Sequence, residues 1–295
     1  MKNQNEIFRF HNANPKELKK EGMEINKIYN ENCLDTMAKM PDCFVDLVVT
    51  SPPYDGLRTY NGYSFPFEDI AKELFRVTKD GGVVVWIVGD ATIKGSESGT
   101  SFRQALFFKE IGFNLHDTMI WEKKDPIPQV KQKRYWNCFE YMFILSKGQP
   151  KIFNGIMVTA KTAGKKRNDT LKQITTGKQV RIQKEWVTAK ERIKKNIWTI
   201  ATVTAKEING HTAVFPEKLA NDHIISWSNE GDLVYDPFMG SGTTAKMSIL
   251  NNRNWIGSEI SSEYCEIIEE RIKKAWEEKR KEKDFTQNSL FGDGM

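Results

Sequence analysis

The sequence predicts a doubly wound α/β fold with a mostly parallel sheet and one inserted basic region. Near-continuous apolar runs, such as FVDLVV at 44–49 and VVVWIVGD at 83–90, are typical of strands buried on both faces of a parallel sheet. Segments with apolar residues at helical spacing alternate with these runs, which is the pattern of a doubly wound sheet. The alternation stops between 151 and 196, where the chain is polar, basic and weakly periodic. We therefore interpret this stretch as an insertion.

The segments before the insertion follow this alternation. A short strand precedes a helix that Pro41 ends, and the amphipathic helix after the first long strand ends at Gly81 and Gly82. The expected strands are 25–30, 44–49, 83–90, 114–123 and 139–148, and the expected helices are 33–41, 67–82 and 101–113.

Regular α/β structure is expected again after the insertion. The predicted helices are 215–228, 242–252 and 261–283, and the predicted strands are 232–238 and 254–260. The far end of the last helix is rich in both acids and bases, which indicates a solvated face.

Positive charge is concentrated in the insertion. The chain has a formal net charge of +5, yet the segment from Lys147 to Lys195 has fourteen Lys and Arg residues against three Asp and Glu residues. The rest of the chain is therefore net negative. A protein that contacts a polyanion at one place distributes its charge in this way. A solvated lysine-rich loop is the alternative interpretation.

Composition argues against several classes of protein. No apolar run approaches the roughly 20 residues that a membrane-spanning helix needs, and the first residues have no apolar stretch typical of a secretory signal. The four cysteines are scattered without a C-x-x-C pair, so we expect neither a disulfide framework nor a metal site. These observations predict a cytoplasmic protein with no membrane partner.

The stretch VYDPFMGSGTTA at 234–245 joins a predicted strand to a helix through a glycine turn. Gly240 and Gly242 allow positive φ or a close approach to a ligand, toward which the first helical amides point. Glu259 ends the next strand, where a carboxylate can accept hydrogen bonds from ribose hydroxyls. Because Gly240, Gly242 and Ala245 also match the dinucleotide fingerprint, a nicotinamide-dependent oxidoreductase is one alternative.

The stretch TSPPY at 50–54 follows the predicted strand at 44–49. Two consecutive prolines end a strand and fix a stiff loop with few N–H donors. A hydroxyl precedes this loop and an aromatic ring follows it.

TSPPY and DPFMGSGTT together resemble the catalytic and cofactor motifs of the DNA amino-methyltransferases that use S-adenosylmethionine. Their catalytic motif has the form (Asp/Asn/Ser)-Pro-Pro-(Tyr/Phe/Trp), and the order of the motifs here, with the insertion between them, resembles the β group. The resemblance runs from about 25 to 274 and includes RYWNCFEYMFILSKG, NIW and HTAVFPEKL. It implies a Rossmann-like methyltransferase fold and methyl transfer to an exocyclic amino group of a flipped base.

The resemblance also implies the site residues. An exocyclic amine conjugated with its ring is a poor nucleophile, so acceptors aligned with its N–H bonds activate it. The Ser51 hydroxyl and the Pro52 carbonyl can serve as those acceptors, and Tyr54 can stack on the flipped base. The implied catalytic residues are Ser51, Pro52, Pro53 and Tyr54. The implied cofactor-binding residues are Asp236, Phe238, Gly240, Ser241, Gly242, Thr243, Thr244 and Glu259.

Serine at the first position of the catalytic motif favours cytosine N4 over adenine N6, which stays an alternative. Methylation of cytosine C5 needs a nucleophilic cysteine, typically after proline, and the chain has no Pro-Cys pair. A DNA-binding module without catalytic function is a further alternative, because it too would contain the basic insertion.

The resemblance divides the chain into four parts. These are an N-terminal extension (1–24), a catalytic half (25–150), a target recognition region (151–205), and a cofactor-binding half with the C-terminal helix (206–295). Lys165, Lys166 and Arg167 are the candidate DNA-binding residues of the recognition region. The implied partner is double-stranded DNA; a cognate restriction endonuclease and a homodimer are options that the sequence leaves open.

Overall fold

The computed structural model describes residues 19–20, 22–53, 65–126, 133–175, 178–203 and 216–291. The chain forms two compact units. The first combines Met1–Asn154 with Asn196–Met295, and the second is Gly155–Lys195. The predicted recognition region, 151–205, contains the second unit.

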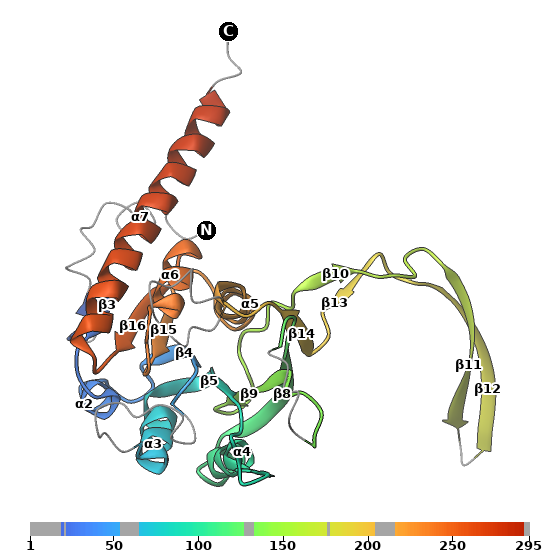
Figure 1. The fold of residues 1–295 in the computed structure, drawn as a ribbon. Helices are drawn as coiled ribbons and strands as arrows, with labels where there is room; N and C mark the ends of the chain where they lie inside the picture. The colour runs from blue at the N-terminus through green and yellow to red at the C-terminus, as the bar shows by residue number, and fades with distance from the viewer. Residues whose placement is uncertain are drawn as a thin grey trace. The chain divides into compact units, whose positions relative to one another are not determined.

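An eight-stranded sheet organises the first unit (Figure 1). Its spatial order is β14-β8-β9-β5-β4-β15-β16-β3. The strands are β3 (Lys27–Tyr29), β4 (Val45–Thr50), β5 (Thr78–Val88), β8 (Asn114–Lys123), β9 (Phe139–Ser146), β14 (Ile197–Ile200), β15 (Leu233–Asp236) and β16 (Asn254–Ser258). All neighbouring pairs are parallel except the two pairs that involve β9. The predicted doubly wound, mostly parallel fold is confirmed.

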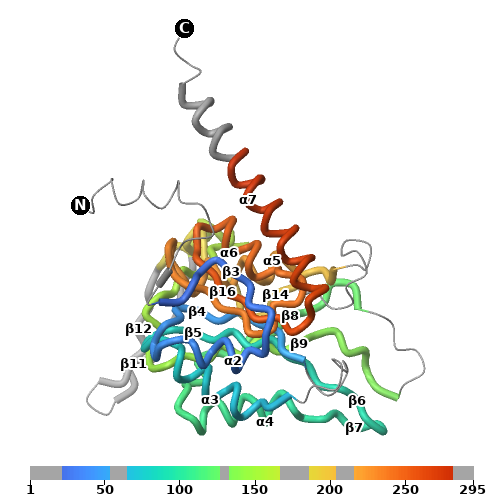
Figure 2. Tube along the Cα trace, turned by 90° about the vertical axis from the view of Figure 1, so that its left-hand side faces the viewer, coloured from blue at the N-terminus to red at the C-terminus, as the bar shows by residue number. Residues whose placement is uncertain are grey.

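Helices cover both faces of this sheet (Figure 2). One layer contains α2 (Cys33–Ala38), α3 (Phe67–Val77) and α4 (Thr100–Glu110). The other contains α5 (Glu217–Trp227), α6 (Thr243–Leu250) and α7 (Ser262–Phe291). Short strand pairs are formed by β1 (Lys19–Lys20) with β2 (Met23–Glu24), and by β6 (Thr92–Ile93) with β7 (Ser96–Glu97).

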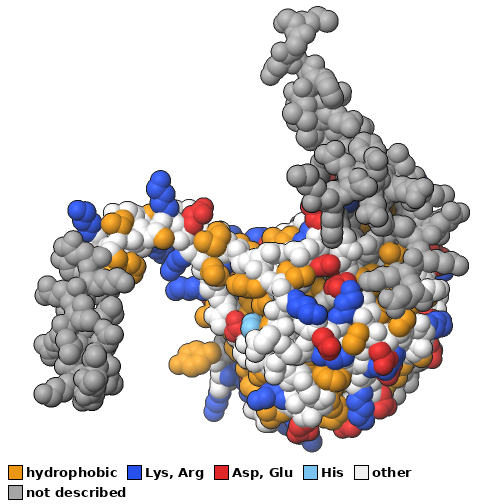
Figure 3. Space-filling view, turned by 180° about the vertical axis from the view of Figure 1, so that it is seen from behind, with side chains coloured by type: hydrophobic (Ala, Val, Ile, Leu, Met, Phe, Trp, Pro, Cys, Tyr) orange, Lys and Arg blue, Asp and Glu red, His pale blue; other side chains and the backbone are white. Residues whose placement is uncertain are grey.

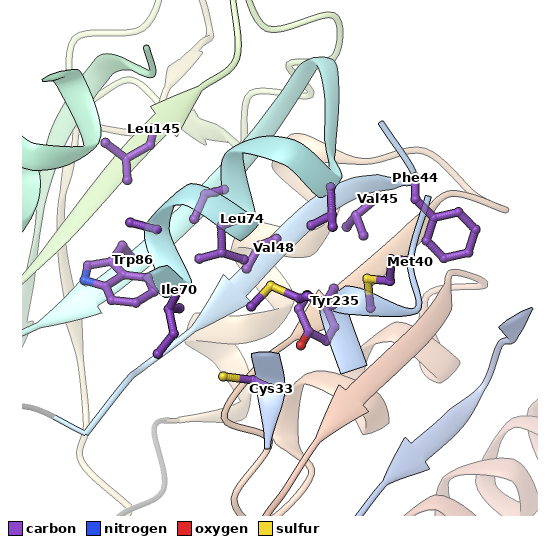
Figure 4. Close-up of a cluster of buried hydrophobic side chains, with 14 of the residues drawn as sticks. Cys33, Met40, Phe44, Val45, Val48, Ile70, Leu74, Trp86, Leu145 and Tyr235 are labelled. Atoms are coloured by element: carbon purple, nitrogen blue, oxygen red, sulfur yellow. The ribbon is translucent and has the colours of Figure 1, made fainter. Parts of the chain in front are cut away.

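The main core lies between the sheet and the layer that contains α2 and α3 (Figure 4). Trp86 of β5, Tyr235 of β15 and Leu74 of α3 are fully buried there. The apolar spacing of α3 places Ile70, Ala71 and Leu74 against the sheet, as the sequence predicts. This packing fixes β4, β5 and β15 relative to one another.

The largest differences from the expected boundaries are at two helices. The helix predicted at 67–82 ends at Val77, because Thr78 already adopts an extended conformation and begins β5. The side chain of Lys79 on this extension pairs with Asp46 of β4. The helix predicted at 261–283 continues to Phe291.

The second unit consists of two antiparallel strand pairs. In one pair, β10 (Met157–Thr159) lies beside β13 (Glu191–Ile193). In the other, β11 (Lys166–Thr175) and β12 (Lys178–Val187) form a long hairpin. The sequence, interpreted as weakly periodic, did not predict this hairpin.

The residues that flank the second unit are held firmly within the first. Asn154 Nδ2 donates to the carbonyl oxygens of Ile225 and Ser228, at 3.0 and 3.1 Å. Asn196 accepts a hydrogen bond on its carbonyl oxygen from the Ile120 amide at 2.9 Å, and its Nδ2 lies 3.3 Å from Asp117 Oδ1. Hydrogen bonds within the first unit therefore hold the residue before the second unit and the residue after it.

Candidate active site

The two motif-bearing loops leave the sheet side by side. The chain runs from β4 through α3 to β5 in one direction along the sheet, and from β15 through α6 to β16 in the other. β4 and β15 are parallel neighbours, with Val234 opposite Leu47 and Tyr235 opposite Val48. Ligands of doubly wound sheets bind at the carboxyl ends of the strands where the order reverses in this way. That position lies between Thr50 and Asp236.

A buried carboxylate joins the two strand ends. Asp236 Oδ1 accepts hydrogen bonds from Thr50 Oγ1 at 2.6 Å and from the Phe238 amide at 3.0 Å. Asp236 Oδ2 accepts from Thr244 Oγ1 at 2.7 Å. The side chains of Thr50, Asp236 and Thr244 are fully buried. Strand β4, which leads into TSPPY, and the glycine loop are thus tied together by hydrogen bonds between side chains far apart in the sequence.

The environment of Asp236 disfavours its charge. Burial raises the pKa of this carboxyl from its usual 3.8 to about 6, although hydrogen bonds from Thr50, Thr244 and the Phe238 amide oppose the shift. The resemblance to the amino-methyltransferases implies that Asp236 and Thr244 bind the cofactor, and in the structure their side chains are hydrogen-bonded to each other. In this structure both side chains therefore stabilise the junction between the strand end and the glycine loop.

The glycine loop between β15 and α6 has the left-handed geometry expected for it. Gly240 has a φ of 55° and Gly242 a φ of 82°. A Cβ atom on Gly242 would lie only 3.2 Å from the side chain of Ile268 on α7. The amide of Gly242 donates to the carbonyl of Met239 at 2.9 Å. Glycine at position 242 therefore satisfies both a backbone and a packing constraint.

Glu259 holds the same loop from the neighbouring strand. Its Oε2 accepts a hydrogen bond from the Gly240 amide and its Oε1 accepts one from the Ser261 amide, both at 2.9 Å. The side chain is 7% exposed, and burial raises the pKa of Glu259 against the effect of these amide hydrogen bonds. Each carboxylate oxygen has a further lone pair. Glu259 can therefore accept hydrogen bonds from a ligand while it shapes the loop.

The remaining side chains of the cofactor motif also contact protein groups. Ser241 and Thr243 are buried, and both hydroxyls lie within hydrogen-bond distance of Arg271 on α7. Phe238 is partly buried, and its ring lies 5.6 Å from that of Phe65. The sequence analysis did not identify Arg271, although its position three residues after the buried Ile268 places it on the inward side of α7.

The TSPPY stretch, predicted to be catalytic, begins at the last residue of β4. Ser51 and Pro53 are partly exposed, and Pro52 is buried. Tyr54, the predicted stacking residue, lies outside the described residues. A partly exposed hydroxyl thus follows the Thr50 anchor immediately in the chain.

The candidate DNA-binding residues lie in the second unit. Lys165 and Lys166 are exposed, and Arg167 is opposite Trp186 in the register of the hairpin. Figure 3 shows Lys and Arg side chains together with hydrophobic ones over the part of this unit that it colours. Exposed hydrophobic residues there include Met157, Trp186 and Ile193, at 50%, 43% and 54% exposure.

The described residues contain no group of three or more His, Cys, Asp or Glu side chains arranged to hold a metal ion. Among the helices in the described ranges, none has the length and apolarity to cross a membrane.

Comparisons with known proteins point to one family. A family model described as DNA methylase, of the N6/N4 type, matches residues 45–270. The orphan methyltransferase M.BamHII of Bacillus amyloliquefaciens is 58% identical over 240 residues, which cover 79% of this chain and 90% of that protein. The type II methyltransferase M.SmaI of Serratia marcescens is 26% identical over 269 residues, covering 77% of this chain and 84% of the relative.

Solved structures show the same fold. The PvuII DNA methyltransferase, described as cytosine-N4-specific, superposes with a TM-score of 0.62 at 23% identity, covering 83% of this chain and 85% of that one. The complex of M1.HpyAVI with SAM superposes with a TM-score of 0.57 at 20% identity, covering 83% and 98%.

Proposed function

The chain belongs to the N6/N4 family of DNA methylases, and from this premise we propose that it transfers a methyl group from S-adenosylmethionine to the N4 amino group of cytosine. Membership of the family makes the chain a DNA amino-methyltransferase and decides against a nicotinamide-dependent oxidoreductase. The observation that carries the proposal is the juxtaposition of Ser51 and the glycine loop, which the Thr50–Asp236 hydrogen bond holds at neighbouring strand ends.

The chemistry of the glycine loop fits this cofactor. Glu259 has acceptor capacity for ribose hydroxyls, and it lies at the end of the strand next to β15. The first-turn amides of α6 have no partner within the helix, and an anionic group such as the methionine carboxylate suits them. When bound, the cofactor supplies an activated methyl group on a sulfonium sulfur.

The catalytic loop prepares the amino group. Ser51 Oγ accepts a hydrogen bond from one N–H of the amino group, and the carbonyl oxygen of Pro52 accepts a hydrogen bond from the other. These two hydrogen bonds direct the nitrogen lone pair toward the methyl group. The proline ring introduces no N–H that could compete for these acceptors. Because Thr50 is buried and hydrogen-bonded, the chain that bears Ser51 begins from a fixed point. The acceptors are thereby preorganised, which is the main way that such sites lower a barrier.

Cytosine is the preferred base because serine occupies the first position of the motif, as is more usual for N4 enzymes of this family. Adenine N6 is the alternative. The base must leave the duplex before it can reach Ser51, and the ring of Tyr54 is proposed to stack on it.

The second unit is proposed to bind the DNA. Its exposed Lys165 and Lys166, with Arg167 next in sequence, can neutralise phosphates, and a two-stranded antiparallel ribbon fits the major groove. A cognate restriction endonuclease, a homodimer and a cytoplasmic location stay predictions.

The test is direct. We expect DNA incubated with the protein and S-adenosylmethionine to yield N4-methylcytosine when it is digested to nucleosides and analysed by mass spectrometry. N6-methyladenine would make the adenine alternative correct. DNA that binds the protein yet acquires no methyl group would support a module without catalytic function instead.

A further inference from the structure

We propose that Arg271, on the C-terminal helix α7, is a positioning residue for S-adenosylmethionine that fixes the peptide bond between Ser241 and Gly242. This inference rests on the proposed cofactor of the glycine loop. Arg271 lies outside both sequence motifs, on the helix that follows the strand ending beside Glu259.

The guanidinium group joins the glycine loop to the start of α5. Arg271 Nη1 donates to the carbonyl oxygen of Ser241 at 2.8 Å and lies 2.7 Å from the Ser241 hydroxyl. Its Nη2 donates to Glu217 Oε1 at 2.7 Å. One rigid side chain thus contacts the loop after β15 and the first residue of α5 together.

The Ser241 carbonyl, which Arg271 contacts, belongs to the turn between β15 and α6 and lies outside both elements. Ser241 lies between two glycines of positive φ, so neither strand nor helix hydrogen bonding sets the orientation of its carbonyl. Arg271 holds the oxygen of the Ser241–Gly242 peptide, and the Met239 carbonyl holds its N–H at 2.9 Å. Both ends of this peptide are therefore fixed. Rotation of the peptide would reorient the backbone at the entry to α6, where the cofactor is proposed to bind.

Glu217 accepts hydrogen bonds from Lys246 as well as from Arg271. Lys246 of α6 donates to both Glu217 oxygens at 2.9 Å. Although burial alone would raise the pKa of Glu217, hydrogen bonds and charge from Lys246 and Arg271 lower it overall, so the group is ionised at neutral pH. Replacement of Arg271 leaves Glu217 paired with Lys246. The fold is therefore expected to tolerate the replacement, and the effect should appear in the glycine loop.

Arginine is required for its geometry. The planar fork of the guanidinium reaches Ser241 with one nitrogen and Glu217 with another, whereas the ammonium of lysine has a single nitrogen. Arg271→Lys preserves the charge, and it removes the two-nitrogen fork, so that one ammonium on a shorter side chain replaces separate nitrogens at Ser241 and Glu217. This variant separates a positioning role from a general effect of charge.

The experiment is calorimetry with S-adenosylmethionine on full-length protein, together with steady-state kinetics. Binding by the unaltered protein tests the proposed cofactor by itself. We expect Arg271→Lys and Arg271→Gln each to raise Kd and KM for S-adenosylmethionine about tenfold, with kcat at saturating cofactor changed by less than about threefold. Ser241→Ala, which keeps the backbone contact, should have a smaller effect on Kd. Lys274→Gln is the matched control, because Lys274 is one turn further along α7 and its ion pair with Glu270 is exposed.

The outcomes are distinct. If the unaltered protein does not bind S-adenosylmethionine, the proposed cofactor is wrong. If it binds and Arg271→Lys binds equally well, the positioning role of Arg271 is wrong. The same conclusion follows if the Arg271 variants lose thermal stability and kcat while Kd stays unchanged. Should Arg271→Gln fail to fold, Arg271→Lys still decides.

Discussion

Thr50 and Asp236 are hydrogen-bonded across two parallel strands, with 2.6 Å between Thr50 Oγ1 and Asp236 Oδ1. The pair lies 186 residues apart in the sequence, and each member ends a strand that leads into a functional loop. This contact ties the strand end that precedes Ser51 to the strand end that precedes the glycine loop.

Removal of the Thr50 hydroxyl should weaken both the fold and the reaction. Thr50→Val keeps the shape but leaves the buried Asp236 carboxylate with one donor fewer, which costs about 1–3 kcal/mol of the free energy of unfolding. We expect kcat to fall about tenfold, since Ser51 then follows a less fixed residue. Thr50→Ser keeps the hydroxyl donor, so this variant should retain most of the free energy of unfolding and most of kcat. Chemical unfolding and turnover at saturating substrates measure the effect; a Thr50→Val enzyme with unaltered turnover would show that the coupling is unimportant.

The charge of Asp236 should make stability depend on pH. Its pKa is about 6 in the folded chain against 3.8 ordinarily, so between these values the folded chain retains a proton that the unfolded chain has released. Stability from this group is therefore present at acidic pH and is lost as the pH rises through about 6.

The Asp236→Asn variant lacks this titration. The unaltered protein loses the Asp236 contribution as the pH rises, and the variant does not. We therefore expect the free energy of unfolding of the variant, minus that of the unaltered protein, to increase by about 1–2 kcal/mol from pH 5 to pH 8. Urea unfolding at both pH values is the measurement. Asp69→Asn is the matched control variant, because it makes the same substitution at an exposed ion pair with Lys72 on α3. A relative stability that decreased with pH would contradict the assignment of a raised pKa.

Loss of the Ser51 hydroxyl should impair the methyl-transfer step selectively. We expect Ser51→Ala to reduce kcat by about 100-fold or more, because one preorganised acceptor of the amino group is missing. Cofactor affinity should change by less than about twofold, since the glycine loop is intact. Single-turnover methylation with radiolabelled cofactor, combined with calorimetry, separates the two quantities. Near-normal turnover at saturating DNA would remove Ser51 from the mechanism.

Glu259 should contribute to cofactor affinity in two ways. Glu259→Ala removes the proposed ribose acceptor and also releases the Gly240 amide, so we expect cofactor affinity to fall by more than about tenfold. Glu259→Gln keeps one acceptor oxygen and should have an intermediate effect. Calorimetry on folded variants is the test, and an unchanged affinity of Glu259→Ala would exclude the ribose assignment.

The basic residues of the second unit should act through phosphates. Replacement of Lys165, Lys166 and Arg167 by alanine together should weaken DNA binding and flatten its dependence on salt. The slope should fall by roughly 0.9 log units per log unit of salt for each lost phosphate contact. Cofactor affinity should survive unchanged. Binding titrations between low and moderate salt provide the measurement, and an unaltered slope would mean that these side chains do not touch the backbone of the DNA.

Much of the sheet unit could be predicted because its signals are local. The buried strands, the glycine turn at Gly240 and Gly242, and the amphipathic α3 each depend on patterns within a few residues. The partners of Asp236, Thr244 and Ser241 could not be predicted in this way. They depend on which strands become neighbours and on how α7 crosses the loop, and neither is encoded in any single segment.

The strands β10 and β13 of the second unit escaped prediction for a different reason. A strand with one buried face alternates between apolar and polar residues, and this alternation is the usual signal for a strand. Within β10 and β13 of the same unit no side chain is buried, and Met157 and Ile193 are half exposed. Where neither face is buried, the alternation is not required, and backbone pairing alone defines the strands.

The firm attachment of Asn154 and Asn196 has an evolutionary consequence. The segment between them starts and finishes at positions that the sheet unit already defines, so the entropy of closing a loop there grows only slowly with its length. Segments of different length and sequence could therefore be exchanged between these two asparagines at little cost to the folding of the catalytic unit. On the proposed role of the second unit, an exchange between these two asparagines would change the DNA target and leave the methyl-transfer chemistry in place.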